Sequence, residues 1–122
     1  MKRTLALFAV LATLAPLAAH AEDHMSDGRY LAASRCLAYA DVSALQGGSD
    51  FTALRNATNA GFRNPAIISR ARDEARTIRA RADALASSGD RGMTTLQQRR
   101  DDACSSFSEQ GLVRLENSTP AS

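Results

Sequence analysis

Two cysteines, Cys36 and Cys104, constrain the fold of this chain more than any other feature of its sequence. They are the only cysteines present, one near the start and one near the end of the expected domain. An even count in a small exported domain most simply forms a disulfide. The alternatives are a metal-binding pair and a catalytic thiol. Two cysteines with no histidine in the domain body supply too few zinc ligands, and a nucleophilic thiol would lack its base. We therefore expect a structural disulfide.

The first 21 residues have the pattern of an export signal. Lys2 and Arg3 supply positive charge ahead of an apolar run over 5–14. Ala19-His20-Ala21 then offers the small residues that a signal peptidase reads. The apolar run is too short to remain as a membrane span, and no second run follows it. We expect cleavage after Ala21 and delivery to the bacterial periplasm, without a stable membrane anchor.

The composition changes once this signal is set aside. The whole chain of 122 residues has 15 Lys+Arg, 13 Asp+Glu and a formal net charge of +2. The signal holds two of the basic residues and no acid, so the remainder carries 13 arginines, 13 acids and no lysine. Its hydrophobic residues include 17 alanines but only 16 Leu, Ile, Val and Phe, which is few for a core of this size. A disulfide closing so long a loop contributes roughly 4 kcal/mol, comparable to the net stability of a small domain.

Apolar residues recur at helical spacing in four segments, and no β-alternation of useful length appears. The third segment is the clearest. Asn64-Pro65 is a strong helix start, because asparagine caps a helix and proline tolerates its first position. The apolar stripe that follows steps by three and four, which suits packing within a bundle. Its members are Ile68, Ala71, Ala75, Ile78, Ala82 and Leu85.

Cap and turn residues predict the limits of the other three helices. The expected limits are Ser26 or Asp27 to Gly47-Gly48 for the first helix, and Ser49 or Asp50 to Gly61 for the second. After a turn at 89–92, a capping box of Thr94 and Gln97 is expected to start the last helix, which carries Leu96, Ala103, Phe107 and Leu115. Gly111 either weakens or ends that helix. The sequence therefore predicts an all-α domain over 22–116, a small bundle of about four helices whose first and last members are joined by the disulfide, and a disordered tail over 117–122.

The mature chain offers little for catalysis. Its one histidine, His24, lies three residues from the new N-terminus. Adjacent carboxylates, as in Asp73-Glu74 and Asp101-Asp102, point about 100° apart on a helix. The chain has no glycine-rich phosphate loop and no haem attachment motif. We expect no catalytic residues, no cofactor and no enzymatic activity.

Five arginines crowd the third segment, against Asp73 and Glu74. Arginine binds carboxylates and phosphates through paired hydrogen bonds, so the cluster can form a surface for an acidic protein partner. The alternative, favoured by the charge balance of the chain, is that the arginines cover the apolar stripe and pair on the helix, as Arg79 can with Asp83. Nucleic acid is not expected as a partner, because its binding needs a stronger positive field and stacking aromatics. The five are Arg70, Arg72, Arg76, Arg79 and Arg81.

Cleavage after Ala21 would expose a candidate metal site. The mature chain would then begin Glu22-Asp23-His24, with a free amine on Glu22. A free amine, two backbone amides and an imidazole at the third position can bind Cu(II) or Ni(II) in a square plane. This arrangement needs only the position of the histidine, so it often arises by chance. The alternative is an acidic, disordered start of the mature chain.

The stretch Tyr30–Leu37, with the late Cys104 followed by Phe107, Leu112 and Leu115, resembles the small helical periplasmic immunity proteins that neutralise type VI secretion amidase effectors. This resemblance implies a non-enzymatic protein that occludes a protein partner. The same features also suit periplasmic acid-stress chaperones with one disulfide. A homodimer is a further arrangement, because the outer face of the third helix carries several small residues.

Overall fold

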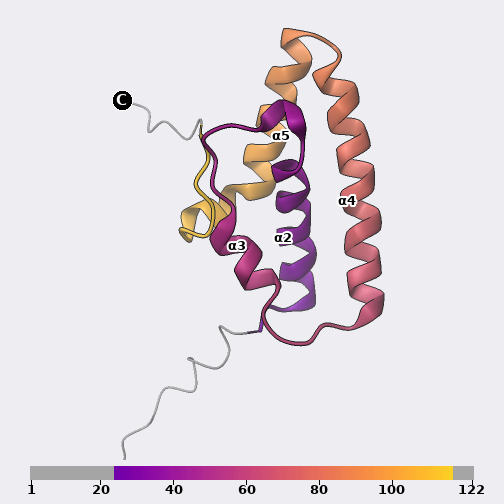
Figure 1. Cartoon of the computed structure of the whole chain (residues 1–122), viewed down its shortest axis with the longest axis vertical. Helices are drawn as coiled ribbons and strands as arrows, with labels where there is room; N and C mark the ends of the chain where they lie inside the picture. The colour runs from indigo at the N-terminus through magenta and orange to yellow at the C-terminus, as the bar shows by residue number, and fades with distance from the viewer. Residues whose placement is uncertain (1–23, 117–122) are drawn as a thin grey trace, which may run out of the picture.

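The computed structural model describes residues 24–116 and contains four α-helices, one short 3-10 helix and no strand within them (Figure 1). The predicted all-α fold of four helices is confirmed. The predicted signal at 1–21 and tail at 117–122 lie outside the described residues. None of the described helices is long and apolar enough to cross a membrane. The elements are α2 (Asp27–Ala40), η1 (Ser43–Leu45), α3 (Thr52–Thr58), α4 (Pro65–Ala86) and α5 (Asp90–Glu109).

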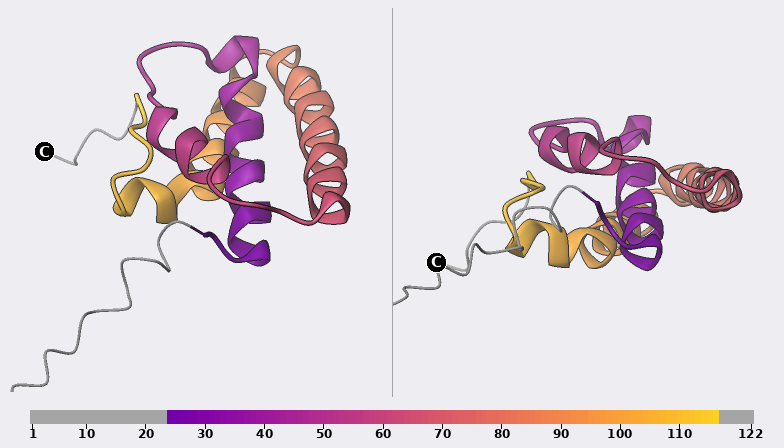
Figure 2. Two further views of the ribbon diagram at one scale, coloured as in Figure 1. Left: turned by 60° about the horizontal axis from the view of Figure 1, so that its bottom comes forward. Right: turned by 90° about the horizontal axis from the view of Figure 1, so that it is seen from below.

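Helix α2 is central to the arrangement. It contacts each of the other three α-helices, with α4 on one flank and α3 and α5 on the other (Figures 1 and 2). The residues that α2 buries include the small Ala33, Cys36 and Ala38. Small side chains let neighbouring backbones approach closely, so a chain with few large apolar residues still packs around this helix.

The predicted starts of two helices are confirmed. The Ser26 side chain caps α2 by accepting a hydrogen bond from the backbone N–H of Arg29 (3.2 Å). Asn64 caps α4 by accepting from the N–H of Ala66 (2.9 Å), and Pro65 is the first helical residue. Both signals are local, since the capping side chain satisfies an N–H only two or three residues away.

The predicted end of the first helix at Gly47-Gly48 is wrong, because α2 ends at Ala40. The chain leaves the helix so that Val42 and Leu45 turn inward, where they form a second core cluster with Ala82 of α4 and Leu96 of α5. Burying two larger aliphatic side chains stabilises the domain more than continuing an alanine stripe would.

The second helix is shorter than predicted. Helix α3 starts at Thr52 and ends at Thr58, ahead of Gly61. Asp50 lies just outside its start and accepts a hydrogen bond from the backbone N–H of Thr52 (2.9 Å). Hydrogen bonds from Thr52, together with the nearby charge of Arg114, hold the pKa of Asp50 below its ordinary value of 3.8.

The capping box predicted at Thr94 and Gln97 is wrong, because α5 begins at Asp90. The Thr94 hydroxyl instead donates to the carbonyl of Asp90 within the helix (3.1 Å). The predicted turn is therefore shorter, and Gly92 lies inside the first turn of α5. There it meets the end of α4 so closely that a Cβ would overlap the carbonyl oxygen of Leu85. Gly92 is thus a packing residue.

Gly111, with φ of 76°, ends α5. Its N–H donates to Ser108 (3.0 Å) and the N–H of Leu112 donates to Phe107 (2.9 Å), the bonding pattern of a Schellman cap. The prediction that the last helix carries Leu115 is therefore wrong, because α5 ends at Glu109. Leu115 is buried in a returning segment whose Arg114 pairs through its backbone with Asp50.

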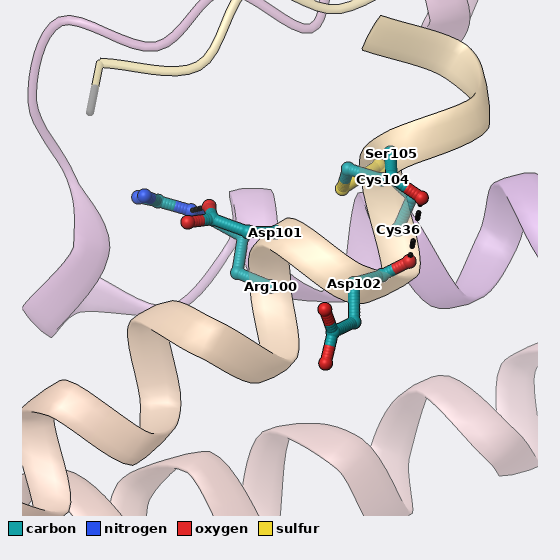
Figure 3. Close-up of a disulfide and its surroundings, with 6 residues drawn as sticks. All are labelled: Cys36, Arg100, Asp101, Asp102, Cys104 and Ser105. Carbon is teal, nitrogen blue, oxygen red and sulfur yellow. Dashed lines mark hydrogen bonds and ion pairs between the residues drawn. A yellow bond between two sulfur atoms is a disulfide. The ribbon is translucent and has the colours of Figure 1, made fainter. Parts of the chain in front are cut away.

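The predicted disulfide is confirmed. Cys36 of α2 and Cys104 of α5 are joined with a Cα–Cα distance of 4.9 Å, and neither side chain is exposed (Figure 3). The bond lies in the first core cluster, so it links the first and last helices from inside the core. The other buried members of this cluster are Ala33, Leu54, Phe107, Val113 and Leu115.

Replacing Cys36 and Cys104 together by alanine should lower the free energy of unfolding by about 2–5 kcal/mol, because the unfolded chain gains the freedom that the long loop now restricts. Denaturant unfolding followed by far-UV circular dichroism measures the difference. Ser105→Ala, at an exposed position beside Cys104, serves as the control and should stay within about 0.5 kcal/mol of the parent. Equal unfolding midpoints for the double variant and the parent would contradict this account.

Two glycines give a matched test of helix packing. Gly92→Ala should destabilise the protein by about 1–3 kcal/mol, because the new methyl overpacks the α4–α5 junction. Gly28→Ala, in the first turn of α2 with nothing within 4 Å of the added Cβ, should instead stabilise it by about 0.4–1 kcal/mol. Thermal unfolding of both variants measures these shifts, and a stabilising Gly92→Ala is the result that would refute the close contact.

Candidate functional site

A groove of about 450 Å³ lies along α2, between α3 and α4. This volume falls in the range of ordinary ligand sites. The residues of α2 that form its floor recur three or four positions apart, so they share one face of the helix. This face is distinct from the one that carries Ala33 and Cys36 into the disulfide core. The floor residues are Tyr30, Ser34, Leu37, Ala38 and Asp41.

The two walls come from separate parts of the chain. Helix α4 contributes Ile68, Ala71, Arg72, Ala75 and Arg79. The opposite wall is Arg55, Thr58, Asn59, Gly61 and Arg63, from α3 and the loop after it. The groove has room because the residues between α2 and α4 are largely alanines. It opens to solvent because several lining residues, Arg55 and Arg72 among them, are exposed.

Positive charge dominates the groove. Two arginines from different helices converge on Asp41, the residue that follows α2. Arg55 lies 2.9 Å from Asp41 Oδ1, and Arg79 lies 3.6 Å from Asp41 Oδ2. Arg72, two turns before Arg79 on α4, forms no ion pair within residues 24–116. The groove therefore has these three guanidinium groups against one lining carboxylate, that of Asp41, which leaves an excess of positive charge along the α4 wall.

A fourth arginine, Arg63, closes one end of the groove and has a structural role. Its side chain is only 5% exposed, and it donates to Asp27 Oδ1 (2.8 Å) and to the Met25 carbonyl (2.6 Å). Its guanidinium carbon also lies 4.4 Å from the centre of the Tyr30 ring. Arg63 thereby ties the α3–α4 loop to the start of α2, which sets the position of one groove wall.

The five arginines of the candidate partner surface all lie on α4 but have different surroundings. Arg72 and Arg79 line the groove. Arg70 pairs with Glu74 (3.3 Å), which also binds Arg35 of α2, and Arg76 pairs with Asp73 (3.6 Å). These pairs match the alternative, in which the arginines pair on their own helix.

Two members of that cluster behave differently from expectation. Arg81 lines a separate hollow of about 50 Å³ beside α5. The pairing of Arg79 with Asp83 is wrong, since Arg79 binds Asp41 instead. The packing of α2 against α4 brings Asp41 within reach of Arg79. This ion pair cannot be predicted from the sequence, because the two residues are 38 positions apart.

Sequence reasoning also missed Arg55, Arg63 and Asp41. Each lies outside the charged cluster, and none belongs to a periodic pattern. It missed Arg100 of α5 as well, which is buried to 2% exposure and binds Asp101 through Nε (3.0 Å). Figure 3 shows the Arg100 side chain extending away from the disulfide. Arg100 does not line the groove, and its Nη2 is buried without a hydrogen-bond partner among the described residues.

The metal site predicted at the mature N-terminus stays a prediction. Glu22 and Asp23 lie outside the described residues, and His24 is described and exposed. Among residues 24–116 no group of three His, Cys, Asp or Glu side chains is placed to hold a metal ion. The candidate site on which function can be argued is therefore the arginine-lined groove.

Comparison with protein families, curated proteins and solved structures finds no match to this chain. The fold and the groove define a small disulfide-linked helical protein with a basic, partly apolar surface channel.

Arg63 and Arg72 line the same groove but should differ in their effect on stability. Arg63→Gln should cost about 1.5–3 kcal/mol, because it removes charge-assisted hydrogen bonds of a buried group. Arg72→Gln should change stability by less than about 0.5 kcal/mol, because it alters an exposed side chain outside any ion pair. Denaturant unfolding measures both, and amide hydrogen exchange at the first turn of α2 should quicken only in Arg63→Gln. Equal losses in the two variants would disprove the structural role of Arg63.

Proposed function

We propose that this protein is a small exported protein of the bacterial periplasm that binds and occludes a protein partner, as an inhibitor or immunity protein does, without enzymatic activity. The groove between α2, α3 and α4 is the proposed contact face. The observation that carries the proposal is the position of Phe62. This side chain is 80% exposed and is the only large hydrophobic residue so exposed among residues 24–116. It lies in the loop between two groove residues, Gly61 and Arg63.

An exposed aromatic residue beside arginines matches the composition of protein interfaces. Interface cores are enriched in aromatic residues and arginine, and the residues that dominate binding energy are often of these types. An exposed phenylalanine is costly for a protein that has few large apolar residues for its core. A partner that covers Phe62 would remove that cost, which supports a role in protein binding.

The lining of the groove favours binding over acid–base chemistry. Asp41 is its only acid, and no histidine or cysteine lines it. Both carboxylate oxygens of Asp41 are engaged by arginines, Oδ1 by Arg55 at 2.9 Å and Oδ2 by Arg79 at 3.6 Å. General acid–base catalysis needs a group poised to exchange a proton. Arginines, by contrast, supply fixed charge and directional hydrogen bonds for recognition.

The disulfide supports both export and a preformed site. Disulfides persist in oxidising compartments, which include the periplasm. The bond fixes α2, whose adjoining face is the floor of the groove. A floor held in place before binding lowers the entropic cost of association. The resemblance of the first helix to periplasmic immunity proteins points to the same class of function.

The test is capture of a partner by the oxidised, signal-free protein from a periplasmic extract of the producing bacterium. The parent should retain one protein at a constant ratio. Phe62→Ala, and separately Arg55→Gln with Arg72→Gln, should each reduce the retained amount at least about tenfold, as expected when a dominant interface contact is lost. The control is Arg76→Gln with Arg91→Gln, two exposed arginines outside the groove, which should retain it fully.

An acid-stress chaperone, the other class that the sequence allows, would behave differently. On mild acidification it would lose near-UV circular dichroism and bind a hydrophobic dye, and at neutral pH it would retain no single partner. That pattern would refute the proposed function. Retention that is indifferent to both the Phe62 and the groove variants would refute the proposed contact face.

A further inference from the structure

Asp41 shows what kind of group the groove accepts. Its carboxylate offers one oxygen to Arg55 and the other to Arg79, so two guanidinium groups from different helices already converge on a single carboxylate. The Asp41 side chain is 46% exposed, as is that of Arg55, and that of Arg79 is 42% exposed. Ion pairs at this exposure contribute little net stability. The arginines can therefore turn from Asp41 to a second anion at small cost.

Arg72 extends this site along α4. It lies seven residues before Arg79, a rise of roughly 10 Å along the helix axis. An extended peptide advances about 3.3 Å per residue. Acidic side chains two to four positions apart on such a peptide can therefore reach Arg72 and the Arg55–Arg79 pair together.

The groove also has an apolar lining, and its rim can hydrogen-bond. On α4 the residue of this lining between Arg72 and Arg79 is Ala75. Leu37 and Ile68 line the groove together with alanines of α2 and α4, whereas Ser34, Thr58 and Asn59 offer hydroxyl and amide groups. An aliphatic side chain of a ligand would be buried on the first set, and the polar backbone of a peptide would be satisfied by the second. The exposed Phe62 lies between the lining residues Gly61 and Arg63, where it can contact an adjacent part of the same partner.

We propose that the groove binds an extended acidic segment of the partner protein, with carboxylates at Arg72 and at the Arg55–Arg79 pair and an apolar side chain between them. This rests on the proposed function and names the chemistry of its partner. Asp41 then acts as an internal competitor, because its negative charge occupies the arginines while the groove is empty. A partner carboxylate displaces it or shares its two arginines.

Charge distribution favours a protein segment over a membrane surface or a nucleic acid. Residues 24–116 hold 13 arginines against 11 aspartates and glutamates, and arginines outside the groove such as Arg35, Arg70 and Arg76 are paired with carboxylates, so these residues carry little net positive charge. Binding to anionic lipid or to a phosphate backbone relies on such a field. A channel with a few positive charges and an aliphatic floor instead fits a short segment that alternates acidic and apolar residues.

The proposal is tested by fluorescence anisotropy with the oxidised, signal-free protein. The probe is a short labelled peptide in which glutamates flank leucine and alanine, and its matched control has glutamine in place of each glutamate. Only the glutamate peptide should bind, and added salt should weaken it. Arg72→Gln should weaken binding about tenfold, the loss of one charge-assisted contact. Asp41→Asn should tighten it about threefold or more, because removing the competing charge frees two arginines. Arg76→Gln with Arg91→Gln should leave it unchanged.

Several outcomes would overturn the proposal: equal binding of the glutamine peptide, no effect of Arg72→Gln, weaker binding by Asp41→Asn, or stronger binding to anionic phospholipid vesicles or single-stranded DNA than to the peptide. Its failure can be told apart from failure of the proposed function. If the peptide fails while partner capture still depends on Phe62, the protein binds a partner through other chemistry. If the peptide binds with the expected variant pattern but no partner is captured, the acidic-segment site stands and occlusion of a partner does not.

Discussion

The disulfide between Cys36 and Cys104 is the constraint on which the rest of this fold depends. It lies within the core and holds α2 at α5 with 4.9 Å between the two Cα atoms. Leu54 of α3 and Val113 and Leu115 of the returning segment pack around it. Part of the chain's few large apolar residues gather around this covalent link, and a second cluster, which includes Val42, Leu45 and Leu96, joins the segment after α2 to α4 and α5. Helix α4 therefore needs only a shallow apolar stripe, of which Ala71 and Ala82 are the buried members.

Helix α2 therefore has two faces with different contacts. One face carries Ala33 and Cys36 into the core, and the other carries Ser34, Ala38 and Asp41 along the groove. Because the first face is covalently anchored, the second presents a fixed floor. Arg63 sets the far wall by tying the α3–α4 loop to the start of α2. The groove is thus a direct consequence of how the core is held, and its arginines face one another only because three helices meet there.

Arginine, which takes the place of lysine throughout the described part of the chain, is used in three ways. Arg63 and Arg100 are buried, and they donate hydrogen bonds to Asp27 and the Met25 carbonyl and to Asp101, respectively. Arg70 and Arg76 form surface pairs with carboxylates of their own helix. Arg55, Arg72 and Arg79 line the groove, where the first and last bind Asp41, and all three carry the proposed recognition of an acidic segment. The guanidinium group suits all three uses because it stays charged when buried and binds carboxylates at two points.

The sequence by itself determined the helical class, the disulfide, and the starts of α2 and α4. These depend on signals that act over a few residues, such as the caps at Ser26 and Asn64, or on the pairing of the only two cysteines. The tertiary structure alone decided where α2 ends, where α5 begins and which charges meet. Helix α2 ends early because Val42 and Leu45 find apolar neighbours on α4 and α5. Helix α5 starts early because Gly92 fits against the end of α4. Asp41, Arg55 and Arg79 come together only when three helices pack, since Coulomb attraction depends on distance in space rather than separation along the chain.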